Sequence, residues 1–417
     1  MRTLLDILLK ENFTVIEESK NNFQRQYAFP SADNIIKVAI GMRRSGKTYF
    51  IYQTINTLLA QGVSKEQILF LDFEDERLLP MNAKEMGKLL DAFYSLYPEN
   101  HERLCYLFLD EVHAVTDWHQ VARRYFQSKK VQLYLTGSSS KLLSKEIHTS
   151  LRGRSLAIEI WPYSFSEFLS MHHVEKAKKP FGQVGFDQHF QYLLNYFDVG
   201  GFPAVQTLSK HEWRDTLQNY VDTTIMRDIV ERYAISNIAV LKYLVFTLLK
   251  NAATTFSIHK FYNDIKSQGY KISKDTIYNY LHYIEDAFLN FMIPVYSESV
   301  RLKQNQAKKT YAVDVGLINA VSLSTNELHG KLFENLIYLD LRRQNKKINY
   351  YYTQEGYEVD FITIDPDGNR ECLQVCWDES DEKTLMREER GLMAAEKELG
   401  IKGRLITPRS YLANNGV

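Results

Sequence analysis

Short apolar runs alternate with stretches of helical periodicity through the first third of the chain. Strands are predicted for the apolar runs at 35–40, 67–73, 104–109, 131–135 and 156–160. Between several of these runs, apolar residues recur with the period of an amphipathic helix, at 48–60, at 82–97 and around 118–126. This alternation of strands and helices predicts an α/β fold for the N-terminal part of the chain.

The junction between the first strand and the first helix carries the pattern Gly-x-x-x-x-Gly-Lys-Thr. Glycines allow a loop to fold tightly around phosphate with its amide N–H groups pointing inward, while the lysine supplies a point charge and the threonine hydroxyl reaches Mg²⁺. A surface turn that happens to contain Gly and Lys is the alternative. Strand, glycine loop and helix are the context that the phosphate-binding motif requires. The sequence therefore predicts that a nucleotide with Mg²⁺ binds to Gly41, Met42, Arg43, Arg44, Ser45, Gly46, Lys47 and Thr48, and the family resemblance described below implies that the nucleotide is ATP.

Two acids, Asp110 and Glu111, stand where the strand at 104–109 ends. In P-loop enzymes the first such acid holds Mg²⁺, and the second can polarise the water that attacks the γ-phosphate. A strand that simply ends in solvated acids is the alternative, and it is disfavoured by the phosphate-binding motif upstream. We therefore expect Thr48 and Asp110 to hold Mg²⁺ and Glu111 to act on water.

Polar residues follow the next strand as well, with Thr136 and Ser138 directly after the apolar run. A strand of this kind beside the Asp110 strand would bring a hydroxyl close to the γ-phosphate, although an ordinary loop has the same composition. Arg152 and Arg154 precede the last strand of this part. They are either solvated charges or groups that reach phosphate, because guanidinium matches phosphate geometry.

The order of these motifs resembles the AAA+ superfamily, and more narrowly a prokaryotic group of ATP-binding proteins whose AAA+ domain is followed by a domain of unknown function. The resemblance rests on Gly-Met-Arg-Arg-Ser-Gly-Lys-Thr, Phe-Leu-Asp-Glu-Val-His, Leu-Thr-Gly-Ser-Ser-Ser and Ser-Leu-Arg-Gly-Arg. It implies a five-stranded parallel sheet with helices on both faces, and the Asp110 strand beside the sensor strand. It further implies Thr136 or Ser138 as the sensor and Arg152 or Arg154 as an arginine finger. No second-sensor arginine can be placed, so the sequence leaves homo-oligomer formation open.

The composition places limits on partners and compartment. The 417 residues contain 51 basic and 51 acidic side chains, so no global field attracts nucleic acid or an anionic membrane. No apolar stretch reaches the length of a membrane span. The three cysteines, Cys105, Cys372 and Cys376, lie in apolar runs without a second Cys/His pair, so we expect buried, reduced thiols, no zinc site and a cytoplasmic protein.

Beyond the first domain, at 1–170, the pattern becomes helical. Residues 171–235 read as a linker and helices interrupted by the bend Gly200-Gly-Phe-Pro203, which either shapes the fold or contacts nucleotide. Residues 236–315 give three short helices and a strand, as in a winged helix-turn-helix. Its basic and aromatic residues serve either a DNA backbone or an ordinary surface: Lys271, Lys274, Tyr278, Arg301, Lys303, Lys308 and Lys309.

The last segment, 316–417, resembles the restriction-endonuclease-like fold. Its order is a helix, three strands, a helix and a strand, with Glu334, Asp360 and Gln374 at the places where such enzymes hold Mg²⁺. Those enzymes also need a lysine two residues after the last of these, and that place is Cys376. Cysteine cannot supply an ammonium group and no nearby lysine replaces it in the sequence. We therefore expect a degenerate, catalytically silent or weak nuclease domain.

The hypothesis from the sequence is an AAA+-type ATPase that couples Mg²⁺-dependent ATP binding and hydrolysis to C-terminal modules that read a partner, with DNA as one candidate. Two alternatives stay open. In one, nucleotide binding is a signalling or scaffold switch with negligible turnover. In the other, the chain is an ATP-dependent nuclease that uses Glu334, Asp360 and Gln374.

Overall fold

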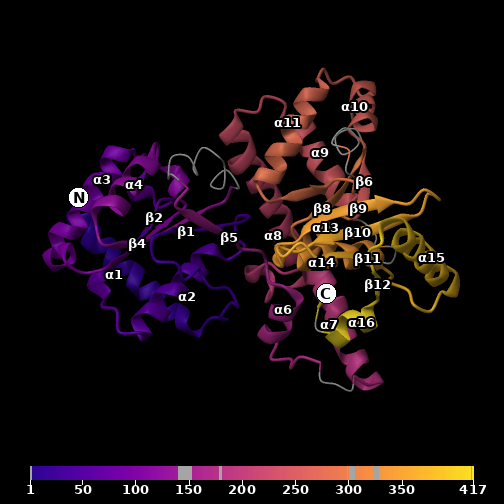
Figure 1. Cartoon of the computed structure of the whole chain (residues 1–417). Coiled ribbons are helices and arrows are strands. Elements are labelled where there is room, and N and C mark those ends of the chain that lie inside the picture. Colours follow the sequence, from indigo (N-terminus) through magenta and orange to yellow (C-terminus); the bar gives the residue numbers. More distant parts are fainter. Residues whose placement is uncertain are drawn as a thin grey trace. The chain divides into compact units, whose positions relative to one another are not determined.

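The computed structural model describes residues 2–139, 153–177, 181–297, 299, 306–322, 328–414 and 416–417. The chain divides into two compact units, Met1–Trp161 and Pro162–Val417 (Figure 1). In the described ranges, no helix is long and apolar enough to cross a membrane. Cys105, Cys372 and Cys376 are buried with free thiols, as expected.

The first unit is built on a five-stranded parallel sheet in the order β2-β3-β4-β1-β5. Its strands are β1 (Ile36–Ile40), β2 (Ile68–Asp72), β3 (Cys105–Asp110), β4 (Val131–Gly137) and β5 (Ser155–Glu159). Every residue of β1 and β4 is buried, which is typical of parallel strands covered on both faces. The predicted parallel sheet, with the Asp110 strand beside the sensor strand, is therefore confirmed.

Helices cover both faces of this sheet. They are α1 (Arg2–Glu18), α2 (Lys47–Ala60), α3 (Ala83–Leu96) and α4 (Trp118–Ser128). Figure 1 shows α2 on one side of the sheet and α3 and α4 on the other. A buried cluster joins Ile51 and Ile55 of α2 to Phe70, Phe108 and Tyr134 of three neighbouring strands. This packing fixes the start of α2 next to the carboxyl ends of β1, β3 and β4.

The second unit begins with helices that meet at a glycine bend. These are α6 (Phe165–Met171), α7 (Gln183–Val199), α8 (Lys210–Thr223), a π-helix (Thr224–Glu231) and, further along the chain, α13 (Val315–Val321). Gly200 follows α7 with φ +77°, and a Cβ atom there would lie 2.2 Å from Asp314 Oδ1. The buried Asp314 carboxylate accepts hydrogen bonds from the amides of Gly201, at 2.7 Å, and Gly316, at 2.9 Å. The glycines of the bend predicted at 200–203 thus allow the backbone to pack closely against Asp314, which supports the alternative in which the bend shapes the fold.

A three-stranded antiparallel sheet in the order β6-β8-β7 follows, packed with three helices. The elements occur along the chain as α9 (Ile238–Lys250), β6 (Thr254–Phe256), α10 (Ile258–Ser267), α11 (Lys274–Asp286), β7 (Asn290–Ile293) and β8 (Lys308–Ala312). Ser257 and Ser273 cap α10 and α11 by accepting hydrogen bonds from backbone amides of the first turn.

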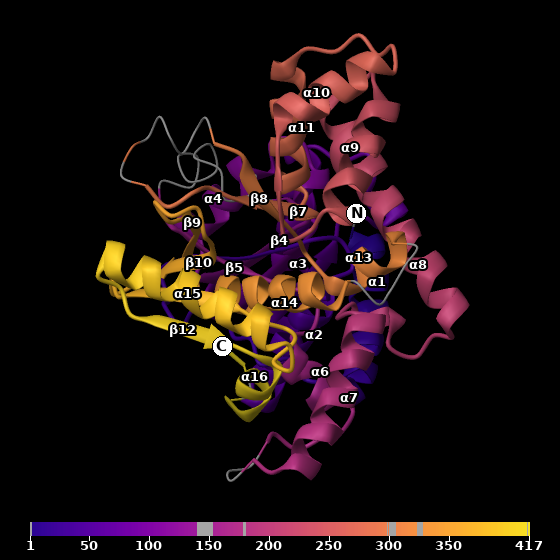
Figure 2. The same cartoon turned by 90° about the vertical axis from the view of Figure 1, so that its right-hand side faces the viewer.

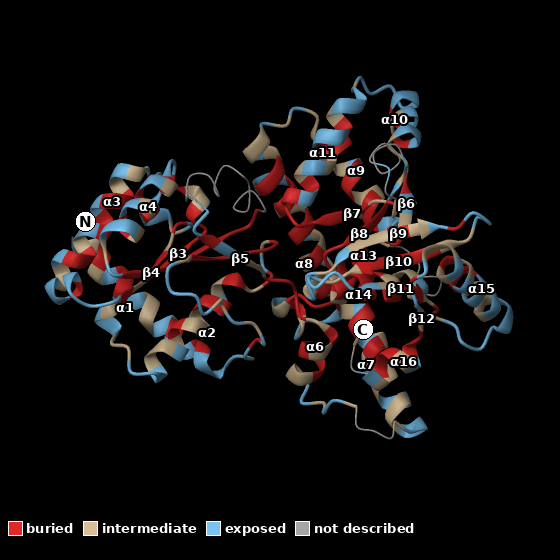
Figure 3. Cartoon of the chain, viewed as in Figure 1, coloured by how far each residue is buried: buried red, intermediate tan, exposed pale blue. Residues whose placement is uncertain are grey.

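The last sheet has four strands in the order β12-β11-β10-β9. They are β9 (Lys347–Tyr352), β10 (Glu358–Ile364), β11 (Arg370–Val375) and β12 (Gly403–Ile406), accompanied by α14 (His329–Arg343), α15 (Glu382–Leu399) and α16 (Pro408–Asn414). Figure 2 shows α15 along β12. Figure 3 shows the buried centres of the sheets in red and the exposed outer turns of helices such as α10 and α15 in blue.

Candidate functional site

The loop between β1 and α2 is shaped by its two glycines. A Cβ atom at Gly41 would lie 2.2 Å from the carbonyl oxygen of Ile160, so no larger residue fits there without a shift of the backbone. Gly46 adopts φ +98° and caps α2, of which Lys47 is the first residue. Met42 and Ser45 are buried, whereas Arg44 is exposed with φ +66°. The predicted loop thus ends at a helix N-terminus, where amide groups favour an anion.

Lys47 turns its side chain back over this loop, and only 4% of it is exposed. Its ammonium group donates to the carbonyl oxygens of Gly41, at 3.2 Å, and Met42, at 3.3 Å. It also lies 3.1 Å from Oε1 of Glu111. The loop lysine and the acid at the end of β3 are therefore in direct contact.

Asp110 closes the other side of the site from the end of β3. Its Oδ2 accepts a hydrogen bond from the Thr48 hydroxyl at 2.7 Å, and its Oδ1 accepts one from the Thr136 hydroxyl. The carboxyl group is 1% exposed, and burial together with the charge of Glu111 raises its pKa above the ordinary value. Thr48 and Asp110 are the oxygen donors that would hold Mg²⁺, which suits hydroxyl, carboxylate and water ligands.

Glu111 is held from three sides. Besides the contact with Lys47, its Oε2 lies 3.2 Å from Nδ1 of His113 and accepts the backbone amide of Ser138 at 3.1 Å. Burial alone would raise the pKa of this carboxyl, but the Lys47 charge and His113 hold the pKa below its ordinary value. The backbone of Glu111 adopts φ +47°, which is uncommon for a residue with a side chain and marks many functional sites.

Both predicted sensor residues contact Asp110 or Glu111. The Thr136 hydroxyl accepts a hydrogen bond from the Glu111 amide at 2.9 Å and donates one to Asp110. Ser138 donates a hydrogen bond from its backbone amide to the Glu111 carboxylate. Arg154 is exposed directly before β5. Arg152 lies outside the described residues.

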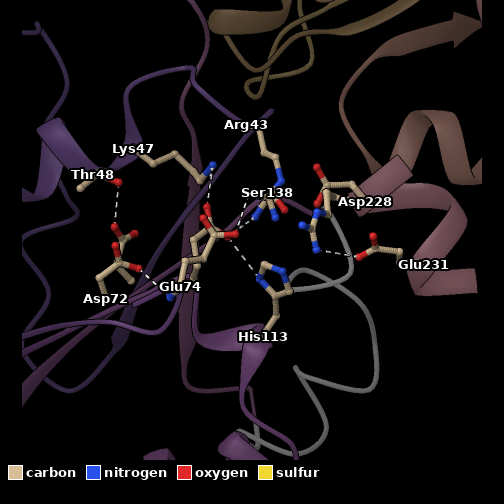
Figure 4. A network of polar contacts seen from close by, with 12 residues as sticks. Arg43, Lys47, Thr48, Asp72, Glu74, His113, Ser138, Asp228 and Glu231 are labelled. Atoms are coloured by element: carbon tan, nitrogen blue, oxygen red, sulfur yellow. Dashed lines mark hydrogen bonds and ion pairs between the residues drawn. The ribbon is translucent and has the colours of Figure 1, made fainter. Parts of the chain in front are cut away.

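Two arginines support the loop from outside the motif's fixed positions. The guanidinium of Arg25, which is 6% exposed, donates to the carbonyl oxygens of Ser45 at 3.0 Å and Trp161 at 2.9 Å. No sequence pattern predicts this role, because Arg25 lies in a segment without helical or strand periodicity. Arg43, within the loop, pairs with Glu74 at 2.5 Å, beyond the end of β2 (Figure 4).

In the second unit, the structure brings Glu334, Asp360 and Gln374 together from α14, β10 and β11, around a residue that the sequence had not suggested for this place. Lys309 of β8 is 2% exposed, and its ammonium lies 2.7 Å from Glu334 Oε1 and 2.8 Å from Asp360 Oδ1. No lysine stands two residues after Gln374, as the sequence showed, but Lys309 of β8 lies beside these residues in space. The suggestion that Lys309 faces a DNA backbone is wrong, because its side chain is buried.

Comparison with known proteins agrees with the geometry of the first unit. A family model for an AAA domain matches residues 33–169, so the chain contains an AAA-type P-loop ATPase domain. A model for a domain of unknown function, DUF8612, matches residues 190–328.

An archaeal relative matches almost the whole chain. "Uncharacterized protein MJ1544" of Methanocaldococcus jannaschii is 36% identical over 402 residues, which cover 95% of this chain and 87% of the relative. The chain belongs to the family of this protein. An uncharacterized protein of Haemophilus influenzae is 27% identical over 345 residues, 82% of this chain and 83% of its own. Among solved structures, the Walker-type ATPase PABY2304 of Pyrococcus abyssi is similar with a TM-score of 0.44 and 12% identity, covering 75% of this chain and 94% of that one.

Proposed function

We propose that this protein is a Mg²⁺-dependent ATPase that couples nucleotide state to its C-terminal modules. Lys47 and the loop amides hold the β- and γ-phosphates, while Thr48 and Asp110 hold Mg²⁺. Glu111 orients the attacking water, Thr136 or Ser138 senses the γ-phosphate, and Arg152 or Arg154 stabilises the transferred charge. The observation that carries the proposal is the pair of contacts Lys47 to Glu111, at 3.1 Å, and Thr48 to Asp110, at 2.7 Å.

Each side chain has a chemical reason for its role. Mg²⁺, when bound, neutralises charge on the phosphate oxygens. Glu111 has a lowered pKa, so its carboxylate is ionised at neutral pH and can accept a proton from water. Its contact with the Ser138 amide keeps it in place beside β4. The Thr136 hydroxyl is hydrogen-bonded both to Asp110, which would hold the metal, and to the backbone amide of Glu111, which would orient water. A shift of either acid would therefore change the position of Thr136.

Turnover separates this proposal from a nucleotide-operated switch. The test is steady-state phosphate release by the full chain, in parallel with nucleotide affinity, for wild type, Lys47→Ala and Glu111→Gln. We expect binding and turnover in wild type, neither in Lys47→Ala, and binding without turnover in Glu111→Gln. Binding with negligible phosphate release in wild type would favour the switch instead.

For the C-terminal modules we propose that α9 to β8, within residues 236–315, form a winged helix that binds DNA. The order of three helices and three strands is that of a winged helix, with α11 in the place of the recognition helix. Exposed basic and aromatic side chains are interleaved on α10, α11 and the turn between them, which suits a phosphate backbone: Lys266, Tyr270, Lys271, Lys274 and Tyr278. Arg301 and Lys303 lie outside the described residues.

DNA binding is tested by titrating a fluorescent duplex with wild type and with a Lys271→Ala/Lys274→Ala variant at several salt concentrations. We expect weaker binding and a shallower salt dependence in the variant, because phosphate contacts release counterions. A variant with Lys10→Ala and Lys84→Ala, both exposed residues of the first unit, serves as the charge-matched control. Equal binding by all three proteins would exclude α11 as the DNA contact.

A further inference from the structure

The second unit contains a cavity of about 570 Å³ whose lining includes an unusual set of charges. One wall is formed by Lys309 of β8, Glu334 of α14, Glu358 and Asp360 of β10 and Gln374 of β11. These residues come from four elements, of which β8 and α14 lie well before β10 and β11 in the sequence. Neither Lys309 nor Glu358 was predicted for this place.

The ammonium group of Lys309 lies at the centre of the set. It contacts Glu334 Oε1 at 2.7 Å, Glu358 Oε1 at 2.7 Å and Asp360 Oδ1 at 2.8 Å. Three carboxylates thus face one ammonium group. A structural ion pair requires only one partner, and an apolar pair of similar volume often gives equal or higher stability. The surplus of carboxylates beside a cavity is therefore better explained by chemistry than by folding stability.

Each acid is also fixed by a second contact. The Tyr311 hydroxyl donates to Glu334 at 2.7 Å, and the Tyr352 hydroxyl donates to Glu358 at 2.6 Å. Oδ2 of Asp360 accepts the Val375 amide at 2.9 Å. Contacts of this kind hold a charged site in a defined geometry, as catalysis requires.

The cavity wall attracts cations more than anions. Mg²⁺ typically takes one or two carboxylates, keeps several waters and completes its shell with substrate phosphate. Lys331 and Arg387 also line the cavity and would meet the charge of a phosphate group.

We propose that this cavity is a second catalytic centre, which hydrolyses phosphodiester bonds of a nucleic acid with Mg²⁺ held by Asp360 and Glu334, and in which Lys309 supplies the ammonium group from β8. The lysine missing at Cys376 is thereby replaced from another strand. Gln374 acts as a positioning residue, because its Oε1 accepts the Asp360 amide at 3.1 Å and its Nε2 donates to Glu388 at 2.6 Å.

The reaction consumes one water for each bond cut. The water oxygen forms a new bond to phosphorus and one ester P–O bond breaks, so the products are a phosphate monoester and an alcohol. One proton of the water leaves to solvent and the leaving oxygen takes one from a water molecule, so no oxidant or reductant takes part. Lys309 and Mg²⁺ offset the negative charge that gathers on the phosphate oxygens.

The test compares four proteins, each as the full chain: wild type, Lys309→Met, Asp360→Asn and Lys347→Met. Lys347 is the control for the loss of a lysine, because it is exposed on β9, in the same sheet as Asp360, and does not line the cavity. Labelled single- and double-stranded DNA and RNA are incubated with Mn²⁺ or Mg²⁺, with and without ATP. We expect metal-dependent cleavage by wild type and Lys347→Met, and a rate at least about 100-fold lower in the other two.

Two further measurements keep the outcome decisive. Glu358→Gln changes a side chain that is 34% exposed, so it disturbs the fold less than the variants at Lys309 and Asp360. Urea unfolding checks the fold of every protein. Mn²⁺ binding followed by electron paramagnetic resonance is expected to be lost at one site in Asp360→Asn but not in Lys47→Ala. Failure of all four nucleic acids to be cut, or cutting that survives both Asp360→Asn and Lys309→Met, would overturn the proposal. Stronger Mn²⁺ binding by Lys309→Met without any cutting would also overturn it, and would make Lys309 a structural substitute for the metal.

Discussion

The ammonium group of Lys47 lies 3.1 Å from the carboxylate of Glu111. The two residues were predicted for separate tasks, one for phosphate and one for water, yet they form a buried ion pair. In the proposed mechanism, phosphate that approaches Lys47 would compete with Glu111 for the same ammonium group. Nucleotide binding would therefore be linked, through this single contact, to the freedom of the acid that we propose to orient water.

Glu111→Gln should reduce turnover without weakening ATP binding. The amide cannot accept a proton from water, so we expect phosphate release to fall by about two orders of magnitude or more. It also competes less strongly for Lys47, so the Kd for Mg·ATP should stay equal or decrease. Phosphate release together with a fluorescent-nucleotide titration measures both effects. Normal turnover in this variant would assign the water-orienting role to another group.

Arg25→Ala should weaken ATP binding although the residue lies outside the motif. Removing its guanidinium leaves the carbonyl oxygen of Ser45 without a charged donor, and such a loss is worth about 1–3 kcal/mol. If all of it appears in binding, Kd rises about 5- to 150-fold. Arg77→Ala is the control, because Arg77 is exposed and pairs with Asp75 and Glu11 at the surface. If both variants bind Mg·ATP like wild type, Arg25 does not position the loop.

Gly200→Ala should destabilise the second unit strongly. A methyl group there would lie 2.2 Å from Asp314 Oδ1 and 2.7 Å from the Cα atom of Gly316, and the backbone has φ +77°. Gly269→Ala is the matched control, because Gly269 has φ +88° but no atom within 4 Å of the new methyl group. We expect a loss of about 1 kcal/mol in the control from backbone strain alone and at least twice that loss at Gly200. Urea unfolding measures both, and equal losses would contradict the close packing at Asp314.

Asp314 should make the second unit less stable at neutral than at acidic pH. Burial raises the pKa of its carboxyl to about 6, against the opposing effect of the hydrogen bonds from Gly201 and Gly316. A raised pKa in the folded state means that the contribution to stability is complete below the ordinary pKa of 3.8 and is lost as pH rises through about 6. The loss is on the order of 2–3 kcal/mol for this group.

The variant Asp314→Asn isolates this effect. Asparagine does not titrate, so the variant should not lose the stability that wild type loses at this position as the pH rises. The urea midpoint of the variant, relative to that of wild type, should therefore be higher at pH 8 than at pH 4.5. The variant loses one acceptor, which lowers its stability at both pH values by the same amount. A difference that is the same at both pH values would show that Asp314 stays charged throughout.

Much of the fold was predictable because local patterns and the fold agree. The apolar runs that became β1 to β4 are long enough to be recognised, and the glycine loop can be identified from its spacing. The contacts that complete the sites were not predictable in the same way. Arg25 reaches Ser45 across a sequence separation of 20 residues and Lys309 reaches Asp360 across 51, and neither separation leaves a periodic signal. No lysine lies near Cys376 along the chain, whereas Lys309 of β8 reaches Asp360 of β10 in space.

The most direct test of the account is calorimetric titration of the full chain with Mg·ATP, with Lys47→Ala as the comparison. The account predicts one nucleotide bound per wild-type chain and no detectable binding by Lys47→Ala, with the urea midpoint of the variant close to that of wild type. Equal affinity in the two proteins, or no binding by wild type, would contradict the assignment of residues 41–48 as the phosphate-binding loop.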